Sequence, residues 1–248
     1  MAYLGAVGGA GQGLIVDSSG VPKWKSAGQS VYTAYDLDFG TVGTETILST
    51  TGTATRTYGG VTWTFQQVGA GSMATSTSGL TMTMNSGSEC YIRAGQTQFG
   101  INDMIQGNYR LWLYQSQYQK NGTSNISGWY MPFAISTSKA VCMRQFNSTN
   151  NKFLYLYPSS TEALYEPSGT DPNYTVFVAE CQGGVVTYRV GTWSSGWPTL
   201  SSCIPYVVCT WPNTAAGTAQ DASAIQTNFY SNGATNVNIY KNLKIEVW

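Results

Sequence analysis

Strict period-two alternation of apolar and polar residues is the feature that most constrains the fold of this chain. Residues 61–66 read VTWTFQ and residues 80–85 read LTMTMN, so every second side chain is apolar. Successive side chains of a strand point to opposite faces, and these segments therefore predict strands with one buried face. The C-terminal VNIYKNLKIEVW predicts another such strand, with Lys241 interrupting an apolar face made of Val237, Ile239, Leu243, Ile245 and Val247.

Turn-forming residues separate the predicted strands. Gly59-Gly60 and Gly183-Gly184 each stand between two alternating segments, which predicts tight hairpins, including one over residues 174–191. Helical periodicity is confined to residues 221–227 (DASAIQT), where we predict a short helix with Asp221 as its N-cap. Many short strands without βαβ units predict an all-β fold, an antiparallel two-sheet β-sandwich.

The N-terminal segment differs in kind from the rest of the chain. Residues 1–29 are rich in Gly and Ala, which bury little apolar surface and lose much conformational entropy on ordering. We therefore predict an extended Gly-rich anchoring arm over residues 1–33 and a β-sandwich domain over residues 34–248. The LIV run predicts a short β-prone stretch, and DSSGVPKWK predicts a turn. The expected anchoring side chains of the arm are Leu14, Ile15, Val16 and Trp24.

The charge composition excludes several partners. Of 248 residues only 10% are charged, with Lys plus Arg and Asp plus Glu both 12. Without a basic excess, nucleic-acid binding by phosphate neutralisation is not expected. A neutral surface does little to keep copies apart and favours a homo-oligomer. No apolar run is long enough for membrane insertion, and the N-terminus lacks signal-peptide features, so we expect synthesis in a cytoplasm.

Residue types also limit the chemistry. The chain has no His, which excludes Ser-His-Asp and Cys-His catalysis. Its five Cys have no CxxC spacing and predict buried free thiols in place of a zinc site. The twelve carboxylates are scattered, without the ExDxE strand pattern of sandwich glycosidases. We therefore expect no enzymatic activity, with a polysaccharide hydrolase or lyase as the remaining alternative.

Asp36 and Asp38, in AYDLDFG, form a candidate metal site. Residues two apart on a strand share a face, and paired carboxylates with backbone carbonyls are calcium ligands. Two interpretations stay open: a structural Ca²⁺ site, or two solvated carboxylates at a strand edge. No other cofactor is expected.

Aromatic residues are the richest signal, with 17 Tyr and 8 Trp. Trp193 and Trp197 stand in the loop-like GTWSSGWP and are expected to be exposed, in contact with either a glycan or a protein. Tyr155 and Tyr157, in FLYLYP, are further candidates for glycan binding. Trp63 and Trp112 are expected in the sandwich core.

The blocks AYDLDFGT, GGVTWTF, SGLTMTMNSG and YKNLKIEVW resemble those of concanavalin A-like and carbohydrate-binding jelly rolls. This resemblance implies a sandwich whose final strand pairs back near the first. The segment GLIVDSSGVPKWKSAG is similar to the N-terminal stretches of tailed-phage fibre and capsid-decorating proteins. That resemblance implies a virion protein.

These observations favour a non-enzymatic structural protein of a phage virion. In this interpretation the arm anchors the chain to capsid or tail subunits of the same virion, and the sandwich is displayed on the particle surface as a homo-oligomer, with a trimer as one form. The alternative is a lectin-like module that binds host-surface glycan through Trp193, Trp197, Tyr155 and Tyr157.

Overall fold

The computed structural model describes the backbone of residues 12–16, 22–26, 31–103, 107–119, 125–136, 139–147, 153–157, 175–210, 224–231 and 235–248. The chain divides into two compact units. The first is Met1–Tyr32 together with Trp248, and the second is Thr33–Val247.

The first unit contains a hairpin. Strand β1 (Gln12–Val16) pairs antiparallel with β2 (Pro22–Ser26), and Leu14 lies opposite Trp24 in this register. The predicted strand at LIV is confirmed. The turn predicted over residues 17–25 is wrong from Pro22 onward, where the chain is strand, and residues 17–21 lie outside the described residues. The reason is that Pro22–Ser26 supplies the backbone partner that a single strand needs. Whether Leu14, Ile15, Val16 and Trp24 anchor the chain stays a prediction.

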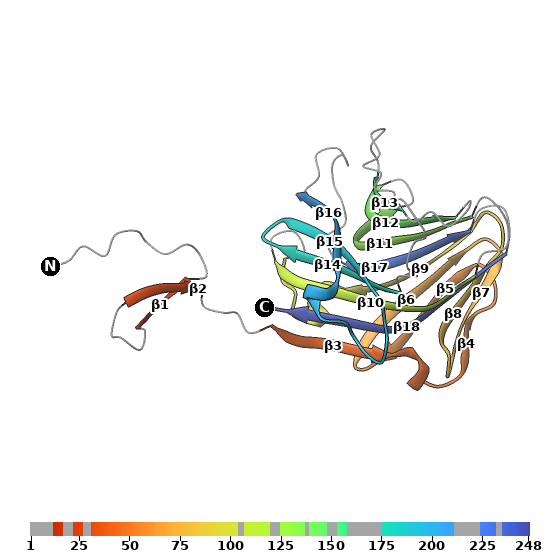
Figure 1. The fold of residues 1–248 in the computed structure, drawn as a ribbon. Helices are drawn as coiled ribbons and strands as arrows, with labels where there is room; N and C mark the ends of the chain where they lie inside the picture. The colour runs from red at the N-terminus through yellow and green to blue at the C-terminus, as the bar shows by residue number, and fades with distance from the viewer. Residues whose placement is uncertain are drawn as a thin grey trace. The chain divides into compact units, whose positions relative to one another are not determined.

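The larger sheet of the second unit contains nine of the described strands (Figure 1): β3 (Tyr32–Asp38), β4 (Glu45–Leu48), β7 (Gly71–Ser76), β8 (Gly79–Met84), β10 (Asn108–Gln119), β14 (Val176–Gln182), β15 (Val185–Gly191), β16 (Ile204–Thr210) and β18 (Asn236–Val247). Their order is β16-β15-β14-β10-β18-β8-β7-β4, and β3 pairs with β18. The final strand therefore pairs back onto the first strand of the sandwich, as the jelly-roll resemblance implies.

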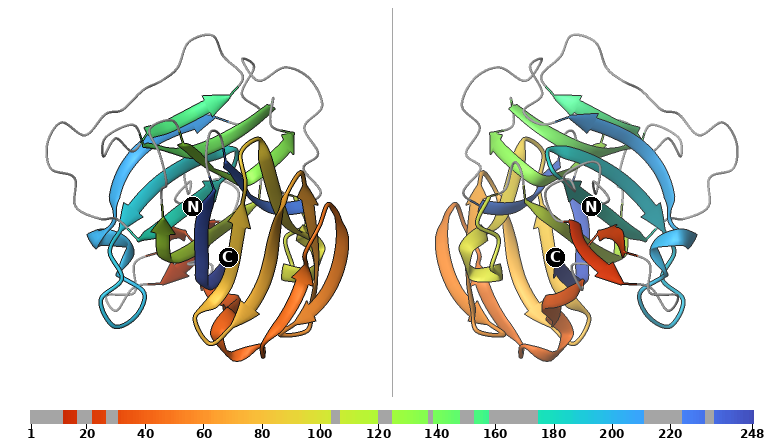
Figure 2. Two further views of the ribbon diagram at one scale, coloured as in Figure 1. Left: turned by 90° about the vertical axis from the view of Figure 1, so that its right-hand side faces the viewer. Right: turned by 90° about the vertical axis from the view of Figure 1, so that its left-hand side faces the viewer.

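The opposing layer is a sheet of order β17-β9-β6-β5, made of β5 (Gly52–Tyr58), β6 (Val61–Val68), β9 (Ser88–Gly95) and β17 (Ala224–Ser231). Three further strands, β11 (Asn125–Ser136), β12 (Lys139–Asn147) and β13 (Phe153–Tyr157), pair in that order. Of these, β11 lies against β17. Figures 1 and 2 show the two layers from three sides.

Every strand pairing with a defined register is antiparallel, which confirms the predicted all-β two-sheet sandwich. The helical segments of the described chain are short 3-10 turns, η1 (Phe39–Thr41), η2 (Gln96–Phe99) and η3 (Leu200–Ser202). Within those residues no helix is long and apolar enough to cross a membrane.

The core lies between the sheets, where the predicted alternation places it. Trp63 and Phe65 on β6 are fully buried, and so are Met82 and Met84 on β8. The Gly59-Gly60 turn is also confirmed, because both glycines have positive φ (58° and 81°), as a tight hairpin turn requires.

The predicted apolar face of β18 is right only in its second half. Leu243 and Ile245 face the core, but nearer the start of the strand Asn238 and Tyr240 are the fully buried residues. The register with β10 shifts where Tyr114 pairs with Asn242 and the next pair joins Gln115 to Tyr240. Lys241 is therefore the extra residue of a bulge, which reverses the faces of everything before it.

The predicted helix over 221–227 is wrong from Ala224 onward, since Ala224–Ser231 is strand β17, paired along its length with β9. Its predicted N-cap, Asp221, lies outside the described residues. Ile225 and Thr227 are both buried, which is period-two spacing. Backbone pairing with a neighbouring strand overrides the weak helical propensity of this segment.

Candidate functional site

The outer face of the larger sheet, turned away from the sandwich core, carries a second apolar cluster. In β10, Leu111 and Leu113 face the core, so the alternation turns Trp112 to the opposite face. Trp112 is thus buried as predicted, but outside the sandwich core where we expected it. This outer cluster contains Trp112, Val176, Val178 and Cys203, with Tyr114, Trp193, Trp197 and Leu200 packed against it.

The segment 192–203, which joins β15 to β16, brings two indole rings to this cluster. Trp193 stacks on Tyr114 with ring centroids 4.2 Å apart and an interplanar angle of 5°. Trp197 meets Trp112 edge-on at 5.9 Å and Trp193 at 5.0 Å, the latter with planes at 76°. Both tryptophans lie in a loop as predicted, but they are half-buried and not fully exposed. Their contact with a glycan or a protein stays a prediction.

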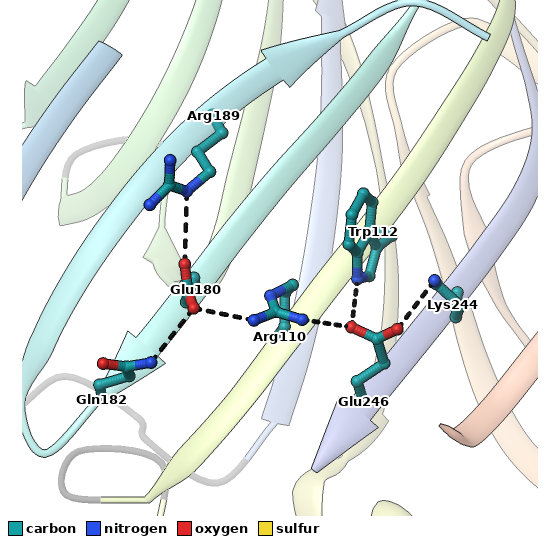
Figure 3. Close-up of polar contacts among 7 residues, drawn as sticks. All are labelled: Arg110, Trp112, Glu180, Gln182, Arg189, Lys244 and Glu246. Atoms are coloured by element: carbon teal, nitrogen blue, oxygen red, sulfur yellow. Dashed lines mark hydrogen bonds and ion pairs between the residues drawn. The ribbon is translucent and has the colours of Figure 1, made fainter. Parts of the chain in front are cut away.

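A row of ion pairs crosses four adjacent strands beside these rings (Figure 3). Arg110 on β10 lies in register with Glu180 on β14 and Glu246 on β18. Its Nη2 is 2.9 Å from Glu180 Oε1 and its Nη1 is 2.7 Å from Glu246 Oε2. Glu180 also accepts hydrogen bonds from Gln182 and from Arg189 Nε at 3.3 Å. The three central side chains are only 8–13% exposed, so this row is largely desolvated.

Glu246 joins the ion pairs to the aromatic rings. It accepts hydrogen bonds from Lys244 Nζ and Trp112 Nε1, both at 2.8 Å. Lys244 Nζ lies 4.3 Å from the centroid of the Trp112 ring and 5.4 Å from that of Trp197. Burial raises the pKa of Glu246, but the hydrogen bonds from Lys244, Trp112 and Arg110 outweigh it and hold the pKa below its ordinary value. Glu246 is therefore ionised at neutral pH.

Asp36 and Asp38 do share one face of β3, as predicted, but have different surroundings. Asp38 accepts a hydrogen bond from the Gly40 N–H at 2.7 Å and pairs with Lys241 at 3.2 Å. Asp36 is exposed, and its neighbours include Lys244 and the Trp197 side chain. Desolvation raises the pKa of Asp36 in spite of the Lys244 charge and a hydrogen bond with Trp197.

The calcium hypothesis finds little support in this arrangement. Calcium takes about six to eight oxygen ligands, and one carboxylate of the pair is already neutralised by an ammonium group. Across the part of the chain that the structure describes, no group of three or more His, Cys, Asp and Glu side chains could hold a metal ion. Calcium binding by Asp36 and Asp38 stays a prediction.

Tyr155 and Tyr157 lie on β13, opposite Cys142 and Ala140 of β12. Their side chains are outside the described residues, so their glycan-binding role stays a prediction. The sequence did not predict that Tyr114 supports Trp193, and it gave no prediction for Lys244 or the Arg110 ion pairs. One signal was present: polar or aromatic residues at every second position, in RLWLY (110–114) and LKIEV (243–247), mark the face opposite the core.

Comparisons with known proteins give only distant similarity. No protein-family model matches the chain, and no curated protein matches it. Among solved structures, the VIP36 exoplasmic/lumenal domain in its Ca²⁺/Man3GlcNAc-bound form is 11% identical, with a TM-score of 0.46 over 78% of this chain and 86% of that one. A protein of unknown function, SO2946 from Shewanella oneidensis MR-1, is 9% identical, with a TM-score of 0.47 over 88% of this chain and 86% of that one. At these values the similarity carries no argument about ligands, and the fold rests on its own strand pairing.

Proposed function

We propose that this chain is a non-enzymatic carbohydrate-binding protein whose ligand surface is formed by Trp193 and Trp197. One observation carries the proposal: the half-buried Trp193 ring stacks on Tyr114, and the half-buried Trp197 ring packs on Trp112. A sugar ring presents C–H groups that pack on an aromatic face and hydroxyls that need hydrogen-bonding partners, and sites of this kind combine the two.

The aromatic surface is held in place before any ligand arrives. Tyr114 covers one face of Trp193, and the edge contacts with Trp112 restrict Trp197. Rings fixed in this way lose little conformational entropy on binding, which favours affinity. The exposed carboxylate of Asp36 lies beside Trp197 and supplies a hydrogen-bond acceptor at the rim.

The two buried glutamates of the ion-pair row are not arranged for glycoside hydrolysis. Glycoside hydrolysis requires one carboxylic acid that is protonated and a second carboxylate. Glu180 and Glu246 are both bound to Arg110, and the lowered pKa of Glu246 keeps it from serving as the acid.

A glycan array probed with the purified protein tests the proposal, followed by titration calorimetry of any hit. We expect Trp193→Ala and Trp197→Ala each to weaken binding about 2- to 12-fold, since an aromatic ring contact is worth about 0.5–1.5 kcal/mol. Tyr91→Ala is the matched control, because Tyr91 is a half-buried aromatic on the other sheet. An array without hits, or hits that both tryptophan variants retain at full affinity, would overturn the proposal.

A second candidate function, attachment to a phage virion, rests on the first unit. This unit carries its own β1–β2 hairpin. An isolated two-stranded hairpin is marginally stable in water, which favours a role in which another subunit covers it. Here the chain is displayed on the particle, and its partners are capsid or tail subunits or further copies of itself. Deleting residues 1–32 should abolish recovery of the protein on particles, and undiminished recovery would exclude attachment through this segment.

A further inference from the structure

We infer that Arg189 recognises an anionic group on the ligand, so that the carbohydrate bound beside Trp193 and Trp197 is an acidic one. This inference rests on the proposed carbohydrate function and specifies its ligand class. The group is a carboxylate or a sulfate, since both offer paired oxygens to a guanidinium fork.

Arg189 is the residue of the ion-pair row whose guanidinium has hydrogen-bond donors available for a ligand. Only its Nε contacts Glu180, at 3.3 Å, and Figure 3 shows no dashed line from its two terminal nitrogens. No hydrogen-bond partner is found for these terminal nitrogens among the described residues. The Arg189 side chain is 24% exposed, against 11% for Arg110 and 13% for Lys244. It is thus the cation of the row that an external anion can reach.

The charge distribution across the sheet favours an anion at this end. Glu246 is shared by Arg110 and Lys244, and Glu180 is shared by Arg110 and Arg189. The row therefore has three cations and two carboxylates. Arg189, on β15, is the last residue at one end of the row. The next carboxylate, Asp36, is a neighbour of Lys244 at the opposite end of the row, on β3.

The strand register also places Arg189 near the aromatic rings. Arg189 is in register with Val178 on β14, and Val178 is in register with Trp112 on β10. Two strand spacings, about 9–10 Å, therefore separate the backbones of Arg189 and Trp112, and Trp197 packs on the Trp112 ring. A ligand of two sugar units can stack on the tryptophans and place an acidic substituent at Arg189.

The test compares three matched oligosaccharides by titration calorimetry: a uronic-acid oligomer, its neutral methyl ester, and a sulfated counterpart of the neutral sugar. We expect the wild-type protein to prefer the acidic forms over the ester, with Arg189→Gln weakening acid binding about 10- to 100-fold. The ester should bind both proteins equally. Arg189→Lys, which keeps the charge but not the fork, should fall between them.

Arg93→Gln is the matched control, because Arg93 is an exposed arginine on the other sheet and its loss changes net charge equally. Melting temperatures of all variants show whether each is folded. If the acid and the ester bind equally and Arg189→Gln changes neither, this inference is wrong while the carbohydrate function stands. If none of the three sugars binds wild type and the array is also empty, the carbohydrate function itself fails. A preference for the sulfated form alone identifies sulfate as the recognised group and supports the inference.

Discussion

Replacing Arg110 with Met should destabilise the second unit by about 3 kcal/mol. Arg110 is the central cation between Glu180 and Glu246, which are 8% and 13% exposed. Removing one partner of a buried ion pair costs about 3–5 kcal/mol, because it leaves an uncompensated buried charge. Here Glu180 keeps Arg189, and Glu246 keeps Lys244, so the lower end of that range applies.

Urea unfolding followed by tryptophan fluorescence measures this cost, provided that the m-value stays unchanged. Arg56→Met is the matched control, because Arg56 and its partner Glu45 are about one-third exposed, at 33% and 34%, and such pairs contribute about 0–1 kcal/mol. A loss below about 1 kcal/mol for Arg110→Met would refute the argument that the row is desolvated.

Three further predictions concern acid, calcium and one turn. The lowered pKa of Glu246 stabilises the folded state fully above the unfolded-state pKa near 4.5, and this stability is lost as the pH falls through the lower folded-state pKa. The melting temperature should therefore drop more steeply in acid for wild type than for Glu246→Gln, and parallel profiles would contradict this. Calcium and EDTA should leave the melting temperature unchanged, because Asp38 is paired with Lys241; a clear rise with calcium would restore the metal hypothesis. Gly60→Ala should cost about 1–2 kcal/mol through its positive φ of 81° alone, since its Cβ would meet no atom within 4 Å, and an unchanged urea midpoint would contradict that reading.

The sequence predicted the sandwich because alternation is a local property. Trp63, Phe65 and Met82 are buried where period two places them, and the hairpins form where paired glycines allow positive φ. The failure in β18 has a physical origin, since Lys241 takes part in a bulge that depends on the register with β10. Register is a tertiary property, and one extra residue exchanges the two faces of a strand.

The candidate site was predictable only in its residue types. Trp193 and Trp197 stand out in the sequence, but their supports, Tyr114 and Trp112, are about eighty residues away and meet them only because β10 lies in the middle of the folded sheet. The same holds for Arg110 and Glu246, which are 136 positions apart. No spacing rule connects groups brought together by strand order.

Ligand footprinting shows whether Trp193 and Trp197 form the ligand surface. Oxidative labelling of the protein, with and without a saccharide that binds it, reports which side chains the ligand covers. We predict that the ligand protects Trp193 and Trp197 from oxidation and leaves the labelling of Tyr32 unchanged. Tyr32 lies on β3 and is 52% exposed. Protection elsewhere, with Trp193 and Trp197 labelled equally in both samples, would contradict the assignment of the ligand surface to these two rings.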